Sequence, residues 1–495
     1  MSNPKNSQDK QENNFERWVI WERPCVPSYV SAAAEAVINP LKKHFTVPWS
    51  KKIYCFFSKR MVRGLWPKQE FIENSLFITN NFLKKEYFQG KIETYETLTK
   101  NLNEQFNLIE KTDLSKLSDQ ELVSDSGKFY EIFLDWWGFG QVAESIAAGS
   151  EFLLKDLNLK AGQINILSAP EEESYTVKEE KELLLIAKLI LDKNLISDLE
   201  NDPEVITRIK KHQRAYFWIN NNYLEVEYLD EQYFIKKIKE ILEKNKNINE
   251  TLTSFKELLL KIKENKENLF RELNFSERDR YVLELISYFV IFQDQRKALS
   301  IKAHYYLQKF IDEFAKRSNI EKELVKYALP HEYKNILNKK LNADELKKRT
   351  EYFAVIFSEE GYEIFNKEDA EKKEKELLGV VGGEVIELRG MGAMKGIVTG
   401  RAKIILHKED FSKMQPGDVL VTTMTSPDFI LSVKKATAIV TDEGGLTCHA
   451  AIITRELGIP SVIGTRFATR TIKDNDIIEV DATHSVVRIK KENKK

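Results

Sequence analysis

Apolar residues recur every three or four positions along most of the first three quarters of the chain. The clearest case is "ERDRYVLELISYFVIFQDQRKALSIKAHYYLQKFIDEFAKR", residues 277–317, which contains neither Gly nor Pro. This spacing gathers the apolar side chains on one helical face, so it predicts one long helix or two abutting ones. Similar patterns predict helices over residues 69–110, 119–157, 176–200, 230–247, 250–272 and 343–357.

A turn-rich segment, "NLKAGQINILSAPEEESYT", interrupts the helical pattern and splits the region near residue 168. Ser168 precedes Pro170 and three glutamates, and we predict that it caps the next helix. We therefore expect a helical body over residues 16–364, with two subdomains. The 15 residues before it are polar and lack the apolar centre of a signal peptide, which predicts a disordered tail.

The pattern changes at "FNKEDAEKKEKELLGVVGG", residues 365–383, a highly charged segment that ends in two glycines. It predicts a solvated helix or tether. Beyond it, short runs rich in β-formers, such as "DVLVTT" and "ATAIVTD", alternate with helical stretches. The fold class expected is therefore multidomain, with a mainly α-helical body followed by a small α/β domain over residues 384–495.

Composition narrows the functional classes. Lys and Arg number 76 against 77 for Asp and Glu, so the chain lacks the basic excess that nucleic-acid binding needs. Cys25, Cys55 and Cys448 are too far apart in sequence to suggest a disulfide framework, which favours a cytoplasmic protein. No apolar run approaches the length of a membrane span.

The strongest chemical signal is "TDEGGLTCHAAIITRELGIPSVIG", residues 441–464. Gly444 and Gly445 permit a tight turn and close approach of a ligand. Thr447 is the best N-cap candidate, which places His449 in the first turn of a helix. Free backbone N–H groups and the positive end of the helix dipole favour an anion there, and a neutral imidazole is a competent nucleophile.

Two other interpretations of His449 compete with a nucleophile. A single His near a helix start is more often structural than catalytic. A metal site needs further ligands, and only Cys448 lies beside it; adjacent side chains on a helix point about 100° apart and cannot readily share one ion. We therefore expect no metal site and interpret Cys448 as a small packing residue.

Four segments resemble, in order, the phosphohistidine domain of the phosphoenolpyruvate-utilising enzymes: "GMGAMKGIVTGRAKII", "GDVLVTTMTSPDF", the histidine segment and "IKDNDIIEVDA". The resemblance implies a β/β/α domain that swivels between active sites with a phosphoryl group on His449. It also implies that Gly444 and Gly445 form the preceding turn and that Thr447 occupies the place of a regulatory threonine. Arg455 and Glu456 would tie the helix to its own domain. Cys448 stands where the family usually has Ser or Thr, a small change.

In that family the histidine is loaded by a strand-rich ATP-grasp domain, whereas the space before the tether is filled here with helical pattern and has no phosphate-binding loop. A helical body ahead of a histidine domain resembles rifampicin phosphotransferase and the histidine subunit of phenylphosphate synthase. This resemblance implies an ATP-grasp partner on a separate chain, which would bind ATP and Mg²⁺. It also implies a small-molecule acceptor held by the helical body.

Two short motifs in the helical body are candidates for acceptor binding. "DWWGFGQ" offers Trp136 and Trp137 as an aromatic wall, with core packing as the alternative. "QDQRK" offers Arg296 and Lys297 for a phosphoryl group or an acidic acceptor, with a solvated stripe as the alternative.

The leading hypothesis is a dikinase-like phosphotransferase component that carries a phosphoryl group on His449 from ATP, bound by its partner, to a small acceptor. The alternative is a non-enzymatic phosphocarrier or regulatory module whose helical body binds proteins. A third hypothesis is that His449 is vestigial.

Overall fold

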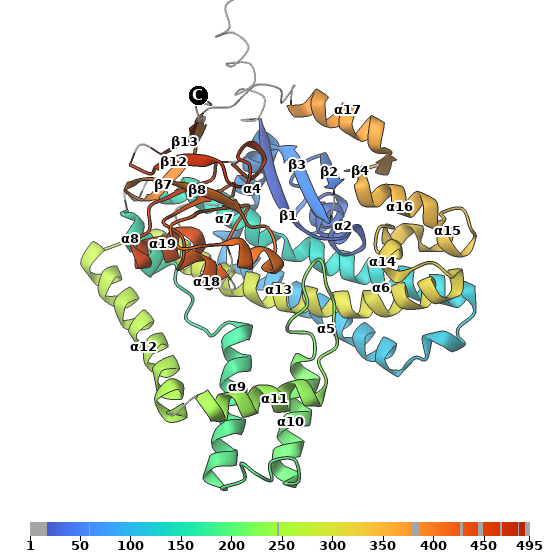
Figure 1. The fold of residues 1–495 in the computed structure, drawn as a ribbon, viewed down its shortest axis with the longest axis horizontal. Coiled ribbons are helices and arrows are strands. Elements are labelled where there is room, and N and C mark those ends of the chain that lie inside the picture. The colour runs from blue at the N-terminus through green and yellow to red at the C-terminus, as the bar shows by residue number, and fades with distance from the viewer. Residues whose placement is uncertain are drawn as a thin grey trace, which may run out of the picture. The chain divides into compact units, whose positions relative to one another are not determined.

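A computed structural model describes residues 17–490 except 59, 156, 158, 245–246, 379–386, 426–428, 444–448, 466–467 and 484. Its described residues form two compact units. The first takes in the described parts of Met1–Pro24, Met61–Leu65 and Glu368–Lys495, and the second comprises Cys25–Arg60 and Trp66–Lys367. The second unit is mainly helical, and the first contains the α/β domain at the carboxyl end of the chain (Figure 1).

The helices of the second unit pack around a 42-residue helix, α13 (Glu277–Ser318). Ser276 caps it by accepting a hydrogen bond from Asp279 N–H, and Asn319 ends it in the left-handed conformation at φ 56°. Apolar side chains on several faces of α13 are buried, because α6 and α7 pack against it. The other helices of this core are α2 (Pro27–Ala36), α3 (Asn39–Phe45), α4 (Lys68–Phe82), α5 (Lys85–Lys111), α6 (Asp119–Gly140) and α7 (Val142–Lys155).

A group of helices after α7 has a hydrophobic core of its own. It comprises α9 (Tyr175–Asp192), α10 (Pro203–Tyr216) and α11 (Glu231–Lys244), joined by the amino-terminal part of α12 (Ile248–Leu273). Figure 1 shows α9, α10 and α11 as a distinct group of green ribbons. Ser174 caps α9 and Asp202 caps α10, whose first residue is Pro203.

Short elements complete the second unit. They are η1 (Leu114–Lys116), α8 (Ala161–Leu167), α14 (Lys322–Val325), η2 (Pro330–Glu332), α15 (Tyr333–Leu337) and α16 (Ala343–Glu351).

A five-stranded sheet lies within the region whose pattern is helical. Its strand order is β1-β3-β2-β4-β5. The strands are β1 (Trp18–Pro24), β2 (Lys52–Ser58), β3 (Met61–Pro67), β4 (Tyr352–Ser358) and β5 (Gly361–Phe365). β4 pairs antiparallel with both β2 and β5, and its five central residues are buried. The next helix, α17 (Lys367–Leu378), accepts a hydrogen bond at Leu377 O from the indole of Trp18, and Arg63 pairs with Glu374.

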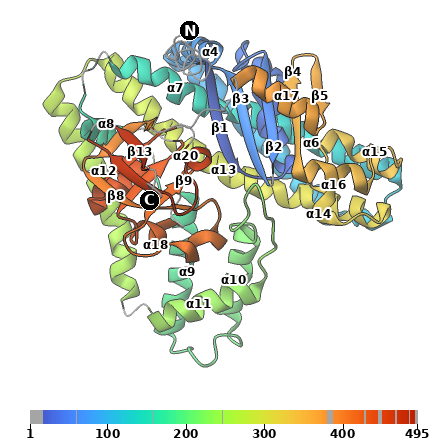
Figure 2. The same cartoon turned by 45° about the horizontal axis from the view of Figure 1, so that its top comes forward.

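The small domain contains an eight-stranded mixed sheet of order β6-β13-β12-β8-β9-β10-β11-β7. β8, β9, β10 and β11 are parallel to one another, and β12, β13, β6 and β7 add antiparallel strands at the two sides. Figure 2 shows β8, β9 and β13 with α18 and α20 in orange to red. The strands are β6 (Glu387–Arg389), β7 (Met391–Met394), β8 (Ile397–Ile404), β9 (Val419–Thr422), β10 (Ala438–Thr441), β11 (Ser461–Ile463), β12 (Ile477–Asp481) and β13 (Val486–Lys490). The helical turns are η3 (Lys408–Lys413), α18 (Ile430–Val433), α19 (His449–Leu457) and α20 (Ala468–Thr471).

The predicted fold class is confirmed: a large helical region precedes a small domain with a mixed sheet. The helical patterns over 69–110 and 119–157 are confirmed, each as two helices, with breaks after Phe82 and Gly140. Two local predictions were wrong. The helix predicted over 343–357 ends at Glu351, and the chain continues as β4. Ser168 lies after α8 and donates to Ile164 O, whereas Ser174 is the cap of α9. Among the described residues, no helix is long and apolar enough to cross a membrane.

His304, near the middle of α13, is a buried titratable group with a structural role. Its side chain is 1% exposed, its ring stacks on Tyr29 at 5.0 Å, and Nδ1 donates to Asn222 O at 3.3 Å. Burial lowers the pKa of His304 to about 4. The imidazole is therefore neutral in the folded protein over the physiological range.

His304 makes stability depend on acid pH. Because its folded pKa lies below the value of about 6.5 expected when unfolded, its contribution is complete above pH 6.5 and is lost as pH falls towards 4. Between pH 7 and 4.5 we expect this group alone to remove about 2.5 kcal/mol from the free energy of unfolding. Urea unfolding at both pH values measures the loss in wild type and in His304→Phe, which has no titrating ring. Equal losses in the two proteins would contradict the prediction.

Candidate functional site

His449 is the first residue of α19, which connects β10 to β11 in the parallel part of the small domain's sheet. The chain reaches it after the carboxyl end of β10, so the amino end of α19 is at the same edge as the carboxyl ends of the parallel strands. This edge of a parallel sheet is where α/β proteins bind ligands, and a helix amino end there favours an anion. The side chain of His449 lies outside the described parts of the structure.

Buried contacts hold α19 in place. Ala450 and Ala451 pack with Ile463 of β11 and Ala393 of β7. The hydroxyl of Thr454 donates to Ala450 O at 2.7 Å and accepts from Ser461 at 2.9 Å. The small side chains at the start of the helix allow it to approach the sheet closely, so the backbone of α19, which begins at His449, is held firmly on the sheet.

The carboxyl end of α19 is also fixed. Gly458 has φ +67°, and the following Ile459 N–H donates to Thr454 O at 2.9 Å, which is a Schellman-type ending. Arg455 donates through Nε to Ala393 O at 3.1 Å, a bond between the helix and β7 of the same domain. The family resemblance implies a tie of this kind for Arg455, and its role stays a prediction.

The strand ends beside the histidine segment form a hydrogen-bonded edge. Asp442 N–H donates to Thr422 O at 3.1 Å, and Glu443 N–H donates to Thr423 O at 2.9 Å. These bonds join the residues that follow β10 to the end of β9 and the residue after it. They extend the pairing of the two strands up to the residue before Gly444.

Asp442 is a buried, hydrogen-bonded carboxylate at this edge, and the sequence interpretation missed it. It is 4% exposed and accepts hydrogen bonds from the backbone N–H of Thr469, at 3.1 Å, and from the Thr469 hydroxyl. Burial raises the pKa of Asp442 to about 6, and the bonds from Thr469 oppose the shift. Burial also raises the pKa of the neighbouring Glu443 to about 8. The sequence does contain a signal for Asp442: it is an acidic residue directly after the apolar run "ATAIVT".

Several predicted site residues cannot be placed. Gly444, Gly445, Thr447 and Cys448 lie outside the described residues, as does the side chain of Glu456. Their predicted roles therefore remain predictions. Among the described residues, no group of three or more His, Cys, Asp or Glu side chains is arranged to hold a metal ion.

The acceptor candidates of the helical body have structural partners. Trp136 is fully buried and donates to the Thr99 hydroxyl at 3.0 Å, and Trp137 is 3% exposed. Arg296 is buried and ion-paired with Glu144, its guanidinium lying 5.2 Å from the Trp137 ring centre. Lys297 is exposed. Trp136, Trp137 and Arg296 therefore belong to a packed interior, which was the alternative interpretation for the tryptophans.

Two buried donors in this interior lack an acceptor: Trp137 Nε1 and Arg296 Nε. A bound water or a polar atom of a ligand would satisfy them. Acceptor binding by Trp136, Trp137 and Arg296 thus remains a prediction. Because all three side chains are buried, an acceptor would reach them only if the surrounding helices moved apart.

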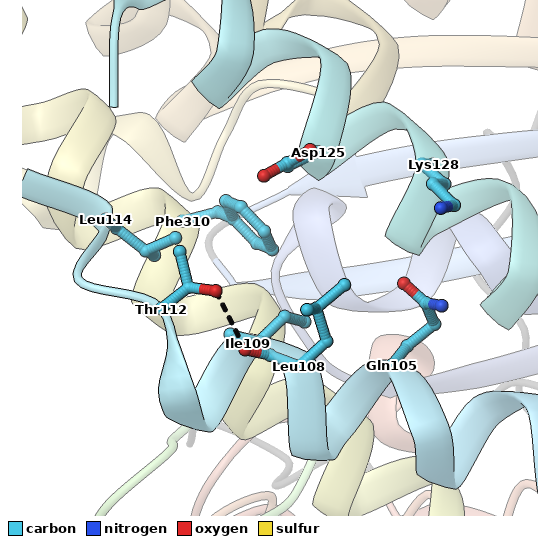
Figure 3. A pocket seen from close by; sticks show the side chains of 8 residues that line it. All are labelled: Gln105, Leu108, Ile109, Thr112, Leu114, Asp125, Lys128 and Phe310. Carbon is cyan, nitrogen blue, oxygen red and sulfur yellow. Dashed lines mark hydrogen bonds between the residues drawn. The ribbon is translucent and has the colours of Figure 1, made fainter. Parts of the chain in front are cut away.

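A small hollow between α5 and α6 is too small for an acceptor. Figure 3 shows its lining, with Asp125 and Lys128 on α6 and Gln105 and Leu108 on α5. Its volume of about 20 Å³ is enough for about one water molecule. Small-molecule sites are usually more than ten times larger.

Comparison with known proteins agrees with the architecture of the small domain. Residues 414–485 match the model of the PEP-utilising enzyme, mobile domain. A probable phosphoenolpyruvate synthase of Archaeoglobus fulgidus is 46% identical over 121 residues, which are 24% of this chain and 16% of the relative. The phosphoenolpyruvate synthase of Aeropyrum pernix is 52% identical over 122 residues, 24% of this chain and 15% of the relative. An uncharacterised phosphotransferase, YvkC, of Bacillus subtilis is 49% identical over 100 residues, which are 20% of this chain and 12% of the relative.

The chain thus spans less than a fifth of the length of these relatives. The similarity is confined to the carboxyl-terminal part of the chain, where residues 414–485 match the mobile domain of PEP-utilising enzymes.

Proposed function

We propose that this protein is a phosphotransferase component in which His449 carries a phosphoryl group from ATP to a small-molecule acceptor held by the helical body. The mobile-domain match over residues 414–485 is the observation that carries the proposal. The position of His449 in the chain supports it, because His449 is the first residue of α19 and the amino end of a helix presents backbone N–H groups that stabilise an anion such as a phosphoryl group.

Loading of His449 is assigned to a separate ATP-grasp protein, where ATP and Mg²⁺ would bind. In support, the region before Glu368 contains helices and one five-stranded sheet among its described residues. Its sequence has no glycine-rich phosphate-binding loop. The helical body is assigned the acceptor. In addition to its main core, the helical body contains the helices α9–α12, which have a hydrophobic core of their own. A domain that only supported the carrier would not need this second group of helices.

The test is phosphoryl labelling of the full chain. The protein is incubated with Mg²⁺ and ATP labelled at the β- or γ-phosphate, alone and with ATP-grasp proteins encoded beside it. We expect acid-labile, base-stable label on the chain only when such a partner is present, and the labelled position identifies which phosphate is transferred.

Absence of label with every partner would overturn the proposal. Label that forms but that no small molecule discharges would favour the alternative, a carrier or regulatory module with a protein-binding helical body.

A further inference from the structure

A histidine–aspartate pair at the end of α3 has the geometry of an acid–base centre. His44 Nε2 lies 2.9 Å from Asp135 Oδ1, and Lys43 Nζ lies 2.8 Å from Asp135 Oδ2. His44 and Lys43 come from α3 and Asp135 comes from α6, so two helices converge on one carboxylate. The bond to Asp135 fixes the orientation of the imidazole and favours the tautomer with its proton on Nε2.

The other ring nitrogen, Nδ1, has no hydrogen bond to the described residues, and the side chain of His44 is 9% exposed. A carboxylate that holds one ring nitrogen while the other is free to accept a proton is the arrangement required of a general base.

Aromatic rings fix the imidazole from the inner side. Phe139 meets the His44 ring edge-on at 5.2 Å, and Phe45 lies at 6.3 Å. Both phenylalanines are buried. Because these rings and Asp135 restrain the imidazole, it does not need to reorganise when a proton is transferred.

The surroundings of the pair favour an anion. Lys91 of α5 donates to the carbonyl of His44 and lies 5.1 Å from the centre of the Phe45 ring, and burial lowers its pKa. Lys42 is paired with Glu359. Although burial opposes it, hydrogen bonds from His44 and Lys43 hold the pKa of Asp135 below its ordinary value. Asp135 is therefore ionised at neutral pH, and Lys43 and Lys91 leave the cluster with a positive balance.

We propose that His44 is the general base of the acceptor site and takes the proton from the acceptor hydroxyl during phosphoryl transfer, with Asp135 as the residue that positions it. This inference rests on the proposed function and adds a residue and an acceptor class to it: an alcohol or phenol. Lys43 and Lys91 supply positive charge for the phosphoryl oxygens.

The step balances as follows in atoms and charge. The P–N bond to His449 breaks, and its electron pair stays on the ring, which leaves as neutral imidazole because its other nitrogen carries a proton. A P–O bond forms with the acceptor oxygen. The hydroxyl proton passes to His44 Nδ1 and from there to water, which regenerates the base.

Two other histidine–carboxylate contacts in the same unit are less suited to this role. His212 lies between Glu179 and Glu182 and is 1% exposed. His331 contacts Glu35 at 2.9 Å and is 34% exposed, but Glu131 and Glu332 are also near enough to influence its charge. Their negative charge would repel a phosphoryl group. His331 is therefore a matched control for His44.

Discharge of the loaded chain tests the proposal separately from loading. Wild type, His44→Ala, His44→Gln, Asp135→Asn and His331→Ala are loaded by the ATP-grasp protein with ATP labelled at the phosphate that the loading experiment identifies, and the label is then chased with phenol or glycerol. We expect equal loading in all five. Discharge should be about 100-fold slower in the His44 variants, reduced in Asp135→Asn and unchanged in His331→Ala.

Added imidazole distinguishes catalysis from structure. It should restore discharge in His44→Ala, where it can occupy the vacated space, and a purely structural role would not respond to it. His44→Gln keeps a donor for Asp135 and so covers the case in which the alanine variant does not fold. Equal discharge in wild type and His44→Gln would overturn the proposal, as would a wild type that transfers to phenol and glycerol no faster than to water.

Acylation by diethyl pyrocarbonate tests the free nitrogen without any loading. Mass spectrometry should show that His44 is acylated at least about tenfold faster than the buried His304, because only an accessible, unprotonated nitrogen reacts. If His44 reacts no faster than His304, the base assignment fails even when loading succeeds. If loading fails while His44 reacts, the proposed function is at fault.

Discussion

Replacing His449 with alanine will abolish the phosphoryl label on this chain, with a loss of at least about 100-fold, because the imidazole of His449 is the proposed nucleophile of the covalent step. The residue begins α19, and the contacts of Ala450, Ala451 and Thr454 hold that helix on the sheet without using the imidazole. The substitution should therefore remove the label without unfolding the domain. The measurement is the amount of acid-labile, base-stable label per chain after incubation with labelled ATP and the ATP-grasp protein.

His407 supplies the matched control. It belongs to the same domain and precedes η3, where its backbone N–H, rather than its ring, bonds to Asp410. His407→Ala should keep the wild-type label. If His449→Ala retains the label, or if both variants lose it, His449 is not the carrier.

Replacing Glu144 with alanine will destabilise the helical body by about 3–5 kcal/mol. Glu144 accepts two hydrogen bonds from Arg296, at 2.6 Å to Nη1 and 2.5 Å to Nη2. The side chain of Arg296 is 7% exposed, and its other acceptors, Gly140 O at 2.8 Å and Gln141 Oε1 at 3.2 Å, are neutral, so removing Glu144 leaves a buried charge without a counter-ion. In the wild type, burial would lower the pKa of Arg296, but the carboxylate of Glu144 raises it. In the variant that support is gone, yet an arginine side chain in a protein does not lose its proton, so Arg296 cannot escape the penalty by becoming neutral.

Urea unfolding followed by tryptophan fluorescence measures this effect in the correct part of the chain, since all seven tryptophans lie at or before Trp218. The exposed pair Lys188–Asp192 is the control, and Asp192→Ala should cost no more than about 0.5 kcal/mol. The double variant Glu144→Leu with Arg296→Met should recover much of the loss, because it buries no charge. A cost below about 1 kcal/mol for Glu144→Ala would show that water reaches the guanidinium.

The wrong local predictions have a common physical origin. "YFAVIFS" is a continuous apolar run, and such a run fits a buried helix as well as a buried strand. Only pairing with β2 and β5 on both sides decides for the strand. Ser168 and Ser174 both stand before suitable helical residues, and the choice between them depends on where α8 ends.

The candidate functional residues also divide into those that local sequence predicts and those that only long-range contacts identify. A nucleophile at a helix start can be inferred from neighbours in sequence, because Gly444, Gly445 and the helix formers after His449 act locally. Asp442 with Thr469, and His44 with Asp135, are joined by hydrogen bonds across 27 and 91 residues. No local pattern predicts which partner each carboxylate finds.

The sequence by itself thus determined the division into a helical region and an α/β domain, the long helix α13 and the position of His449 at the start of a helical run. These follow from periodicity and local turn chemistry, which act over a few residues. The tertiary structure alone decided the five-stranded sheet, the burial of Trp136, Trp137 and Arg296, and the pairing of His44 with Asp135. Each of these depends on contacts between distant segments, and the free energy of burial and of charge pairing is defined only once those segments meet.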